Sequence, residues 1–324
     1  MRAPARLFFR LGFIAWVTSL TFLLLAQSDR GSITGTVSDS SGAAIPGVVV
    51  KATQTATNFS REVTTTDTGN YTIPELPAGV YTLSITHSGF KAYARSGITV
   101  AVSQVVGVDV ILEVGALTET IEVHADASLL RTENAELSTT VTNTYITNLP
   151  LDFSNNIRNP MSFLRIVPGA VVNSDAGWPV TSQNGLQSFT EEIRIDGATS
   201  TNPTPGVFNE AQPSVDAIQE FSVQTSNFNA EYGQAGGAIF NFTLRSGTNN
   251  LHGSAYEYLR NEFLNAKNKD LEASAAKTKQ RRHDFGGTAG GPFTIPRLYN
   301  GRDKTFWFTS YEEFYTRDHR EGFY

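Results

Sequence analysis

The stretch Gly31-Ser-Ile-Thr-Gly-Thr-Val37 alternates apolar side chains with small or polar ones. Such alternation is typical of a β-strand that buries one face. A turn signal, Asp39-Ser-Ser-Gly42, follows this strand, and Ile45-Pro-Gly-Val-Val-Val50 supplies the next run of β-branched residues. The two runs and the turn between them predict a β-hairpin at the start of an all-β unit.

The same succession of short strands and turns continues as far as Gly115. The turn signals are Thr66-Asp-Thr-Gly69 and Leu76-Pro-Ala-Gly79, and the strands beside them are Tyr71-Thr-Ile73 and Val80-Tyr-Thr-Leu-Ser-Ile85. Turn signals at this spacing are typical of a β-sandwich. We therefore predict a sandwich over residues 31–115, with Tyr71 and Tyr81 in its core.

Four short motifs in this region carry a resemblance to a known family. They are Gly35-x-Val37-x-Asp39, Ile45-Pro46-Gly47, Thr66-Asp67-x-x-Asn70-Tyr71 and Leu76-Pro77-x-Gly79-x-Tyr81. Through these motifs, residues 31–115 resemble the carboxypeptidase regulatory-like domain. The resemblance implies a seven-stranded, transthyretin-like sandwich of the carbohydrate-binding-like type. Such a domain is an accessory module, so the family name implies no peptidase activity.

The N-terminal residues have the shape of a secretory signal. Arg2, Arg6 and Arg10 give a positive start without acidic residues, and an apolar run from Leu11 to Ala26 follows. This run is shorter than the roughly 20 residues that a helix needs to cross a bilayer. We predict an export signal in residues 1–26. An uncleaved N-terminal anchor is the alternative, because the residue at position 24 is a leucine rather than the small residue that a cleavage site prefers.

A short segment, residues 116–128, follows the sandwich and is predicted to be a linker with one strand. Its core resembles a TonB box, the extended stretch that an energised periplasmic protein captures by adding it to a sheet as a strand. The residues of this TonB-box-like segment are Thr118, Glu119, Thr120, Ile121, Glu122 and Val123. Any edge strand with alternating Thr, Ile and Val would look similar, so the interpretation depends on the position of the segment before the next unit.

Residues 129–249 form a mixed segment that is rich in Asn, Gly, Thr and Ser. Residues 160–169 predict one or two helical turns that stop at Pro168-Gly169, and Glu191-Glu-Ile-Arg-Ile-Asp-Gly197 predicts a strand that runs into an Asp-Gly turn. A helical start that feeds a strand is predicted over residues 213–223, and a glycine-rich turn before another strand over residues 230–244. The segment is therefore predicted to be an α+β domain.

Several separated blocks of this segment resemble the plug domain of TonB-dependent transporters. They are Leu149-Pro150 with Asn155 to Asn159, Ile193-x-Ile195-Asp196-Gly197, Ala217-Ile218-Gln219-Glu220-Phe221, Ala230-Glu231-Tyr232-Gly233, Gly236-Gly237-Ala238 and Ser246-Gly247-Thr248-Asn249. The order of the blocks is similar in particular to the Oar-like receptors, which carry the regulatory-like sandwich in front of the plug. Thr243-Leu244-Arg245 departs from the family, which usually has a Val-Thr-Lys run there.

Six residues of these blocks are candidate plug-site positions: Asp196, Gly197, Tyr232, Gly233, Gly236 and Gly237. We expect Tyr232-Gly233 and Gly236-Gly237 to allow positive φ and close backbone approach, as a plug folded inside a barrel requires. Ordinary turn and bulge glycines are the structural alternative to a gating or solute-contact role.

From Asn250 onward the sequence shifts to alternating strands rich in aromatic residues. These strands are Gly253 to Arg260, with Tyr256, Tyr258 and Arg260 on one face, then Arg282 to Phe293, and Lys304 to Phe314. This pattern is typical of outer-membrane strands, and residues 285–292 and 303–308 resemble the opening barrel strands of the same receptors. A plugged transporter barrel has about 22 strands, whereas residues 250–324 supply only the first few. We therefore expect an incomplete barrel, and either a piece of a longer protein or a truncated gene.

Composition and motif spacing exclude several classes of function. The net charge of −6 is spread along the chain without a basic stripe, which excludes the electrostatic pattern of a nucleic-acid-binding protein. The chain has no cysteine, and its five histidines stand singly. The acidic pairs Glu191-Glu192 and Glu312-Glu313 are interpreted as solvated charges at strand ends rather than as acid/base couples. We predict no enzyme activity, no catalytic residue, no metal site and no cofactor.

These features together predict the N-terminal part of a TonB-dependent outer-membrane receptor or transporter for an unidentified solute. The expected partners are a TonB-type energising protein, outer-membrane lipid around the barrel, and a carbohydrate or other solute. Export would place the sandwich and the plug on the periplasmic side of the cell outer membrane. The alternative is an envelope or surface protein that binds through its carbohydrate-binding-like sandwich and has no transport activity of its own.

Overall fold

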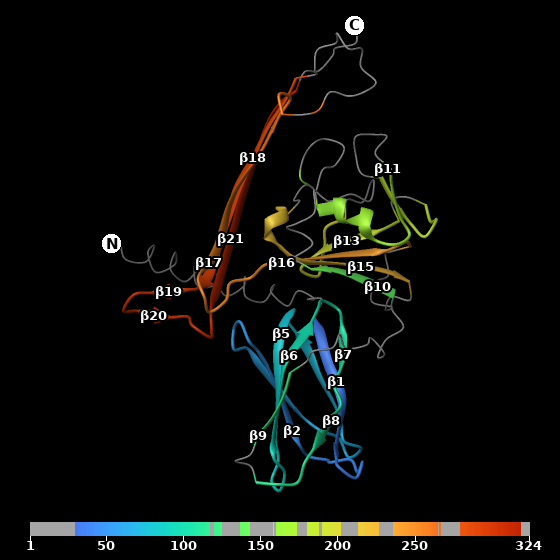
Figure 1. Ribbon diagram of the computed structural model, residues 1–324, viewed down its shortest axis with the longest axis vertical. Coiled ribbons are helices and arrows are strands. Elements are labelled where there is room, and N and C mark those ends of the chain that lie inside the picture. The colour runs from blue at the N-terminus through green and yellow to red at the C-terminus, as the bar shows by residue number, and fades with distance from the viewer. Residues whose placement is uncertain are drawn as a thin grey trace, which may run out of the picture.

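The computed structural model describes residues 30–116, 120–124, 137–142, 158, 160–173, 180–187, 190–201, 213–226, 236–264, 266 and 279–318. They form a sandwich (residues 30–124), a central unit (residues 137–244) and a long sheet (residues 252–318), as Figure 1 shows. Strands make up nearly all of the regular structure, which confirms the predicted mainly β fold. In the described part of the chain, no helix has both the length and the apolar character needed to cross a membrane. The predicted export signal lies outside the described residues.

Two sheets form the sandwich. One contains β4 (Asn70–Leu76), β1 (Gly31–Asp39), β7 (Val105–Gly107) and β8 (Val110–Leu112). The other runs in the order β3 (Ser60–Thr64), β2 (Val49–Gln54), β5 (Gly79–Thr86), β6 (Ala92–Val100) and β9 (Thr120–His124). Because β7 and β8 follow one another along β1, they act as one interrupted strand. Counted in this way, the strands from β1 to β8 make the predicted seven-stranded sandwich, and β9 is an additional edge strand.

Alternation along the strands fills the core of the sandwich. Ile33 and Val37 of β1 are fully buried. Tyr71 and Tyr81 are 2% and 0% exposed, which confirms that both lie in the core. The Tyr71 hydroxyl donates a hydrogen bond of 2.6 Å to the carbonyl oxygen of Val108. Burial raises the pKa of Tyr71 well above its ordinary value, so this phenol stays neutral and remains a donor.

One strand of the sandwich begins later than the sequence predicts. The run from Ile45 was expected to be extended, but β2 begins at Val49. Gly47 has a φ of 71°, and its N–H donates to the carbonyl oxygen of Thr65. Since Pro46 has no N–H to offer a neighbouring strand and Gly47 is left-handed, this dipeptide forms a turn that delays the strand.

A five-stranded sheet organises the central unit, in the order β10 (Leu137–Thr142), β15 (Ile218–Ser226), β16 (Ile239–Leu244), β13 (Glu192–Ile195) and β14 (Ala198–Thr199). One face packs Phe221, Phe240 and Phe242 together with residues of the short helix η2 (Pro160–Ile166). The hairpin of β11 (Ala170–Asn173) and β12 (Val180–Gln183) follows η2, and η3 (Val215–Ala217) leads directly into β15. The helical turns predicted before Pro168 and before this strand are both confirmed.

The predicted Asp-Gly turn joins β13 to β14. Asp196 and Gly197 have φ values of 48° and 80°, and Ile195 pairs with Ala198 across them. Positive φ at both central residues of a two-residue loop defines a type I′ turn, whose twist suits the flanking strands. The Oδ1 atom of Asp196 also accepts a hydrogen bond of 2.9 Å from the N–H of Leu244, which anchors the turn to the end of β16.

The second face of the central sheet is polar and buried. Arg194, Asn241 and Ser222 lie side by side across β13, β16 and β15, and they are 8%, 2% and 3% exposed. Glu191 and Glu192 are 4% and 6% exposed, so the prediction that they are solvated was wrong. Glu192 shares this face with Arg194, whose Nε atom lies 3.5 Å from Glu192 Oε1. Glu192 accepts a hydrogen bond of 2.8 Å from the hydroxyl of Thr199 in β14.

The long sheet consists of β17 (His252–Asn261), β18 (Gln280–Pro292) and β21 (Phe306–Asp318), all antiparallel. A small hairpin of β19 (Thr294–Ile295) and β20 (Tyr299–Asn300) connects the last two strands. The register confirms that Tyr256, Tyr258 and Arg260 share one face, where Gly286 lies opposite Tyr256. A Cβ atom on Gly286 would lie 2.6 Å from the Tyr256 hydroxyl, so glycine is required for this packing.

A substitution in the sandwich core tests the role of the buried phenol. Tyr71→Phe should destabilise the sandwich by about 1 kcal/mol, because the carbonyl group of Val108 loses its donor. Tyr71→Ala should cost about 3–5 kcal/mol, because it also leaves a cavity. Hydrogen exchange of the β1 and β4 amides in the whole chain measures both effects. Equal exchange in the wild type and in Tyr71→Phe would show that the hydroxyl group contributes nothing.

Candidate functional site at the junction of the central unit and the long sheet

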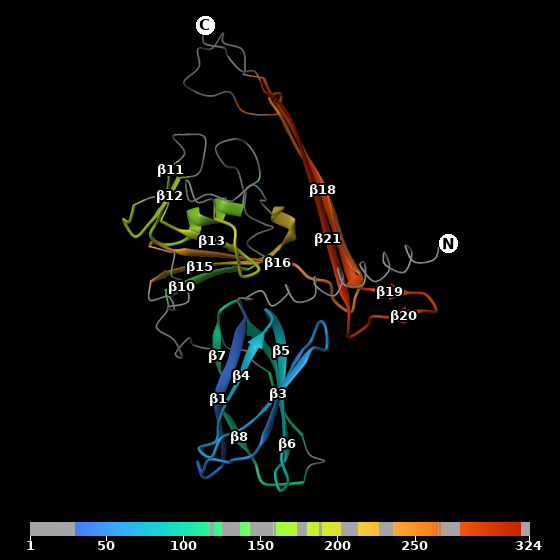
Figure 2. The ribbon, with the colours of Figure 1, turned by 180° about the vertical axis from the view of Figure 1, so that it is seen from behind.

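Arg158 joins the central unit to the long sheet. These two units lie side by side in Figures 1 and 2. Its Nη1 atom donates a hydrogen bond of 2.7 Å to Oδ2 of Asp216 in η3, and lies 3.6 Å from Oε1 of Glu312 in β21. The three side chains are 11%, 12% and 7% exposed. One guanidinium group therefore holds two carboxylates from different units away from water.

Two tyrosines of β17 complete the surroundings of Arg158. The guanidinium carbon lies 4.3 Å from the ring centroid of Tyr258 and 5.2 Å from that of Tyr256. Attraction between a cation and an aromatic face adds to the ion pairs when water is excluded. A planar guanidinium group can stack and donate at once, which a lysine ammonium group cannot do.

A second charged pair lies on the same face of the long sheet. Arg282 Nη2 lies 3.0 Å from Oδ2 of Asp284, and the Asp284 side chain is fully buried. Glu312 also belongs to this buried face, so the prediction that it is a solvated strand-end charge was wrong. The reason is that the central unit covers the middle of β21, and a strand residue covered by another unit is not recognisable from its own neighbours in sequence.

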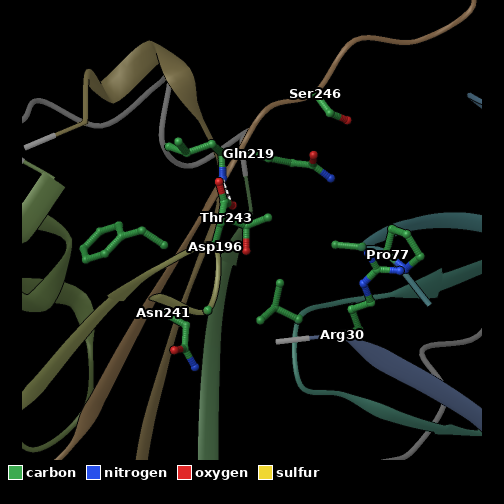
Figure 3. A pocket seen from close by; sticks show the side chains of 12 residues that line it. Arg30, Pro77, Asp196, Gln219, Asn241, Thr243 and Ser246 are labelled. Carbon is green, nitrogen blue, oxygen red and sulfur yellow. Dashed lines mark hydrogen bonds between the residues drawn. The ribbon is translucent and has the colours of Figure 1, made fainter. Parts of the chain in front are cut away.

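A small pocket separates the sandwich from the central unit, and its lining residues are drawn in Figure 3. Arg30, Pro77 and Val102 line it from the sandwich, and Asp196 and Thr243 from the central unit. Its volume of about 170 Å³ is below the roughly 300–1,000 Å³ of pockets that enclose small-molecule ligands. We therefore regard this pocket as a gap in an interface rather than as a binding site for a bulky solute.

The interface beside this pocket is held by polar contacts. The Val102 N–H donates a hydrogen bond of 2.6 Å to Oε1 of Glu220 at the start of β15.

Partial burial raises the pKa of Asp196, and the hydrogen bond from the N–H of Leu244 opposes this shift. In the described part of the chain, no group of three or more His, Cys, Asp or Glu side chains could hold a metal ion.

The predicted plug-site positions that the structure describes are not gathered in one place. Asp196 and Gly197 line the pocket as a type I′ turn. Gly236 and Gly237 have no positive φ, so that part of the prediction was wrong. Close approach does hold at Gly237, where a Cβ atom would lie 2.7 Å from the Thr190 hydroxyl oxygen. Tyr232 and Gly233 lie outside the described residues.

The TonB-box-like segment occupies the edge of the sandwich. Its residues from Thr120 to Val123 belong to β9, which pairs in parallel with β6. Thr118 and Glu119 lie outside the described residues. The extended conformation expected for this segment is confirmed for its described part, whereas the strand that it pairs with was not foreseen.

Sequence reasoning missed the charged junction itself. Arg158 was noted only as part of a block of asparagines, and Asp216 only as part of a helical start. No local signal marked it, because Glu312 is an acidic residue within an aromatic strand whether or not another unit covers that strand.

Comparisons with known proteins agree with this architecture. The carboxypeptidase regulatory-like domain model matches residues 32–113, and the model described as an outer membrane beta barrel domain matches residues 243–324. The TonB-dependent transporter Oar of Myxococcus xanthus is 30% identical over 302 residues, which cover 90% of this chain and 27% of that protein. The chain belongs to the Oar-like TonB-dependent receptors. This confirms the resemblance seen in the sequence.

Solved structures of TonB-dependent receptors also match this Oar-like receptor chain. The siderophore receptor PirA from Acinetobacter baumannii is 20% identical, with 49% of this chain and 22% of that chain covered and a TM-score of 0.35. The ferric yersiniabactin uptake receptor FyuA from Yersinia pestis is 13% identical, with 56% and 28% covered and a TM-score of 0.33. Both TM-scores are low, so family membership rests on the sequence matches.

The Oar-like receptors are outer-membrane proteins, and the relatives named above are a transporter and receptors rather than enzymes. The chain spans about a quarter of the length of its curated relative, since 27% of Oar is covered. The outer membrane beta barrel match of residues 243–324 includes the long sheet, whereas the assignment of the central unit as a plug remains a prediction.

Removing the buried cation tests the junction. Arg158→Ala should weaken the attachment of the central unit to the long sheet by about 3–5 kcal/mol, because the buried Asp216 and Glu312 side chains lose the cation between them. The double variant Arg158→Ala/Asp216→Ala should lose less stability than the two single variants lose when their effects are added. Urea titration with hydrogen exchange of η3 and β21 measures both.

Arg61→Ala is the matched control for this prediction, because Arg61 forms an exposed ion pair with Glu75. It should change stability by at most about 1 kcal/mol. An equal effect of the two single variants would contradict a special role for Arg158.

The type I′ turn gives a prediction about pH. Asp196→Asn keeps the acceptor for the Leu244 N–H and tolerates positive φ, but it does not titrate. The folded-state pKa of Asp196 is raised above 3.8, so the stability that its protonated form contributes is lost as pH rises through that folded value. The thermal midpoint of Asp196→Asn should therefore rise relative to the wild type between pH 3 and pH 7.

Asp196→Ala separates titration from geometry. The free energy of unfolding should fall by about 1 kcal/mol because the hydrogen bond to the Leu244 N–H is lost. It should fall by about 1–2 kcal/mol more because alanine is strained in the left-handed backbone conformation. This loss should be seen at both pH values. A midpoint for Asp196→Asn that falls relative to the wild type as pH rises would refute the pKa shift.

Proposed function

We propose that this chain provides the periplasmic and plug parts of an outer-membrane transporter that is energised by a TonB-type protein and imports an unidentified solute. The observation that carries the proposal is the Arg158 junction. Through it, a compact unit is seated on the face of strands that match the outer membrane beta barrel model. The similarity to Oar over 90% of the chain supports the same function.

The connectivity suggests how a pull on the TonB-box-like segment would reach the plug. This segment precedes β10, which is the edge strand of the central sheet and pairs only with β15 among the described strands. Thr142 of β10 pairs with Glu220 of β15, and β15 continues directly from η3, which carries Asp216. Tension on β10 would therefore act first on β15 and then on the Asp216–Arg158 pair.

The proposed placement in the envelope follows from the same order of parts. Residues 1–26 serve as the export signal, the sandwich and plug lie on the periplasmic side, and the long sheet contacts outer-membrane lipid. The alternation of the long sheet supports this placement. Tyr311 and Tyr315 point to the exposed face, at 62% and 49% exposure, while Asp284 and Glu312 point to the covered one.

Binding of a TonB-type protein tests the proposal. Ile121→Pro should lower the affinity of the chain for the purified periplasmic domain of a TonB-type protein from the same genome by about tenfold or more, because proline removes a backbone N–H and does not fit a strand that gains a neighbour. Isothermal titration calorimetry with the chain in detergent measures the affinity.

Ile121→Val is the matched control, and it should bind like the wild type because it keeps the backbone and a β-branched side chain. Wild-type chain that does not bind the TonB-type domain would overturn the proposed coupling. Equal binding by the proline and valine variants would place the contact elsewhere.

A further inference from the structure

The edge strand β9 is an unusual addition to the sandwich. It runs parallel to β6, with Ala92 opposite Thr120 and Ser96 opposite His124. It is the last strand of a five-stranded sheet, and of the strands that the structure describes, none pairs with its outer edge. Four of its five residues belong to the TonB-box-like segment. The sandwich therefore holds most of this segment by its backbone and leaves one row of donors and acceptors uncovered.

The chain is guided to this edge by specific contacts. After β8, the N–H of Lys91 donates a hydrogen bond of 2.8 Å to the carbonyl oxygen of Glu113, and the N–H of Gly115 donates one of 3.2 Å to that of Gly89. Phe90 and Val114 form an antiparallel bridge between these bonds. The Lys91 ammonium group lies 3.4 Å from the Glu113 carboxylate.

These contacts fix where the chain between β8 and β9 begins, because residues 113–115 are bonded to the loop that immediately precedes β6. At Gly115 a Cβ atom would lie 2.6 Å from the Lys91 side chain, so this close crossing favours glycine. The next described strand after the crossing is β9, which enters alongside the first residue of β6.

We propose that the sandwich is a platform that presents the TonB-box-like segment to its partner. In this arrangement, β6 holds residues 120–124 extended, and a TonB-type protein adds its own strand to the outer edge of β9. The proposal rests on the function proposed above and adds to it a role for the sandwich. It gives this accessory domain a task in recognition of the energising partner.

The physical basis is that a strand has two hydrogen-bonding edges and β6 occupies one of them. A free peptide loses backbone entropy when it is captured as a strand. Residues that are already extended on β6 have lost that entropy, so the partner meets an ordered edge rather than a flexible segment. The competing mechanism is displacement, in which the partner must first remove β9 from β6.

A reversible lock distinguishes presentation from displacement. Ser96→Cys/His124→Cys joins two residues that are opposite one another in β6 and β9, in a chain that contains no other cysteine. Neighbouring strands lie about 4.8 Å apart, which is within the Cα range for a disulfide. The lock leaves Thr118 to Val123 unchanged. The probe is the same periplasmic domain of the TonB-type protein, titrated onto the chain in detergent before and after reduction with dithiothreitol.

Presentation predicts that the oxidised chain binds the probe with an affinity within about twofold of the reduced chain. A loss of about tenfold or more on oxidation, restored by reduction, would overturn presentation and establish displacement. Failure of the disulfide to form under oxidant would also overturn it, because it would mean that β9 does not rest on β6. If neither redox form binds and the wild type does not bind either, the proposed TonB coupling fails together with the platform role.

The single variants Ser96→Cys and His124→Cys are the matched controls, and dithiothreitol should not change their affinity. Hydrogen exchange on the wild-type chain gives a second readout that needs no substitution. With the probe bound, the amides of residues 92–96 and 120–124 should keep or gain protection. Loss of protection in residues 92–96 upon binding would contradict presentation.

Discussion

A guanidinium group that is almost withdrawn from water organises the C-terminal two thirds of this chain. Arg158 stands between Asp216 of the central unit and Glu312 of the long sheet, with Tyr258 stacked beside it. Buried ion pairs contribute little net stability, since desolvation offsets attraction, but they penalise any arrangement that separates the partners. The junction therefore selects one seating of the central unit on the strands. It also makes separation of the central unit from the strands costly unless all three groups can be rehydrated together.

The same constraint explains the chemistry around the junction. Asp284 and Arg282 pair on the same covered face, and Gly286 leaves room for the hydroxyl of Tyr256. At the other side of the central sheet, Arg194, Asn241 and Ser222 form a buried polar face, while Phe221, Phe240 and Phe242 fill the apolar one. The central unit thus has one face that packs as an ordinary core and one that is polar although it is covered.

Local signals predicted the elements well. The Asp196-Gly197 turn, the helical start before β15 and the alternation of β1 depend on residues that are neighbours in sequence, and each was found where it was expected. Burial of Glu192 and Glu312 depends on which unit covers a strand, so their local sequence gave no warning. The position of β9 depends on strand partners about thirty residues away, as in the pairing of Ala92 with Thr120. Periodicity shows that a strand exists but does not choose its neighbour.

The parallel direction of β9 has a mechanical meaning. A force applied along an edge strand, toward one of its ends, loads all of its ladder bonds together in shear, whereas a force across the strand opens them one at a time. In the chain, β9 lies between the short crossing that is tied to Lys91 and the first strand of the central unit, β10. A pull along its axis would therefore meet its greatest resistance at β6, and a pull outward from the sheet would meet the least. The direction of the pull would decide whether the sandwich bears the load or passes it on to the central unit.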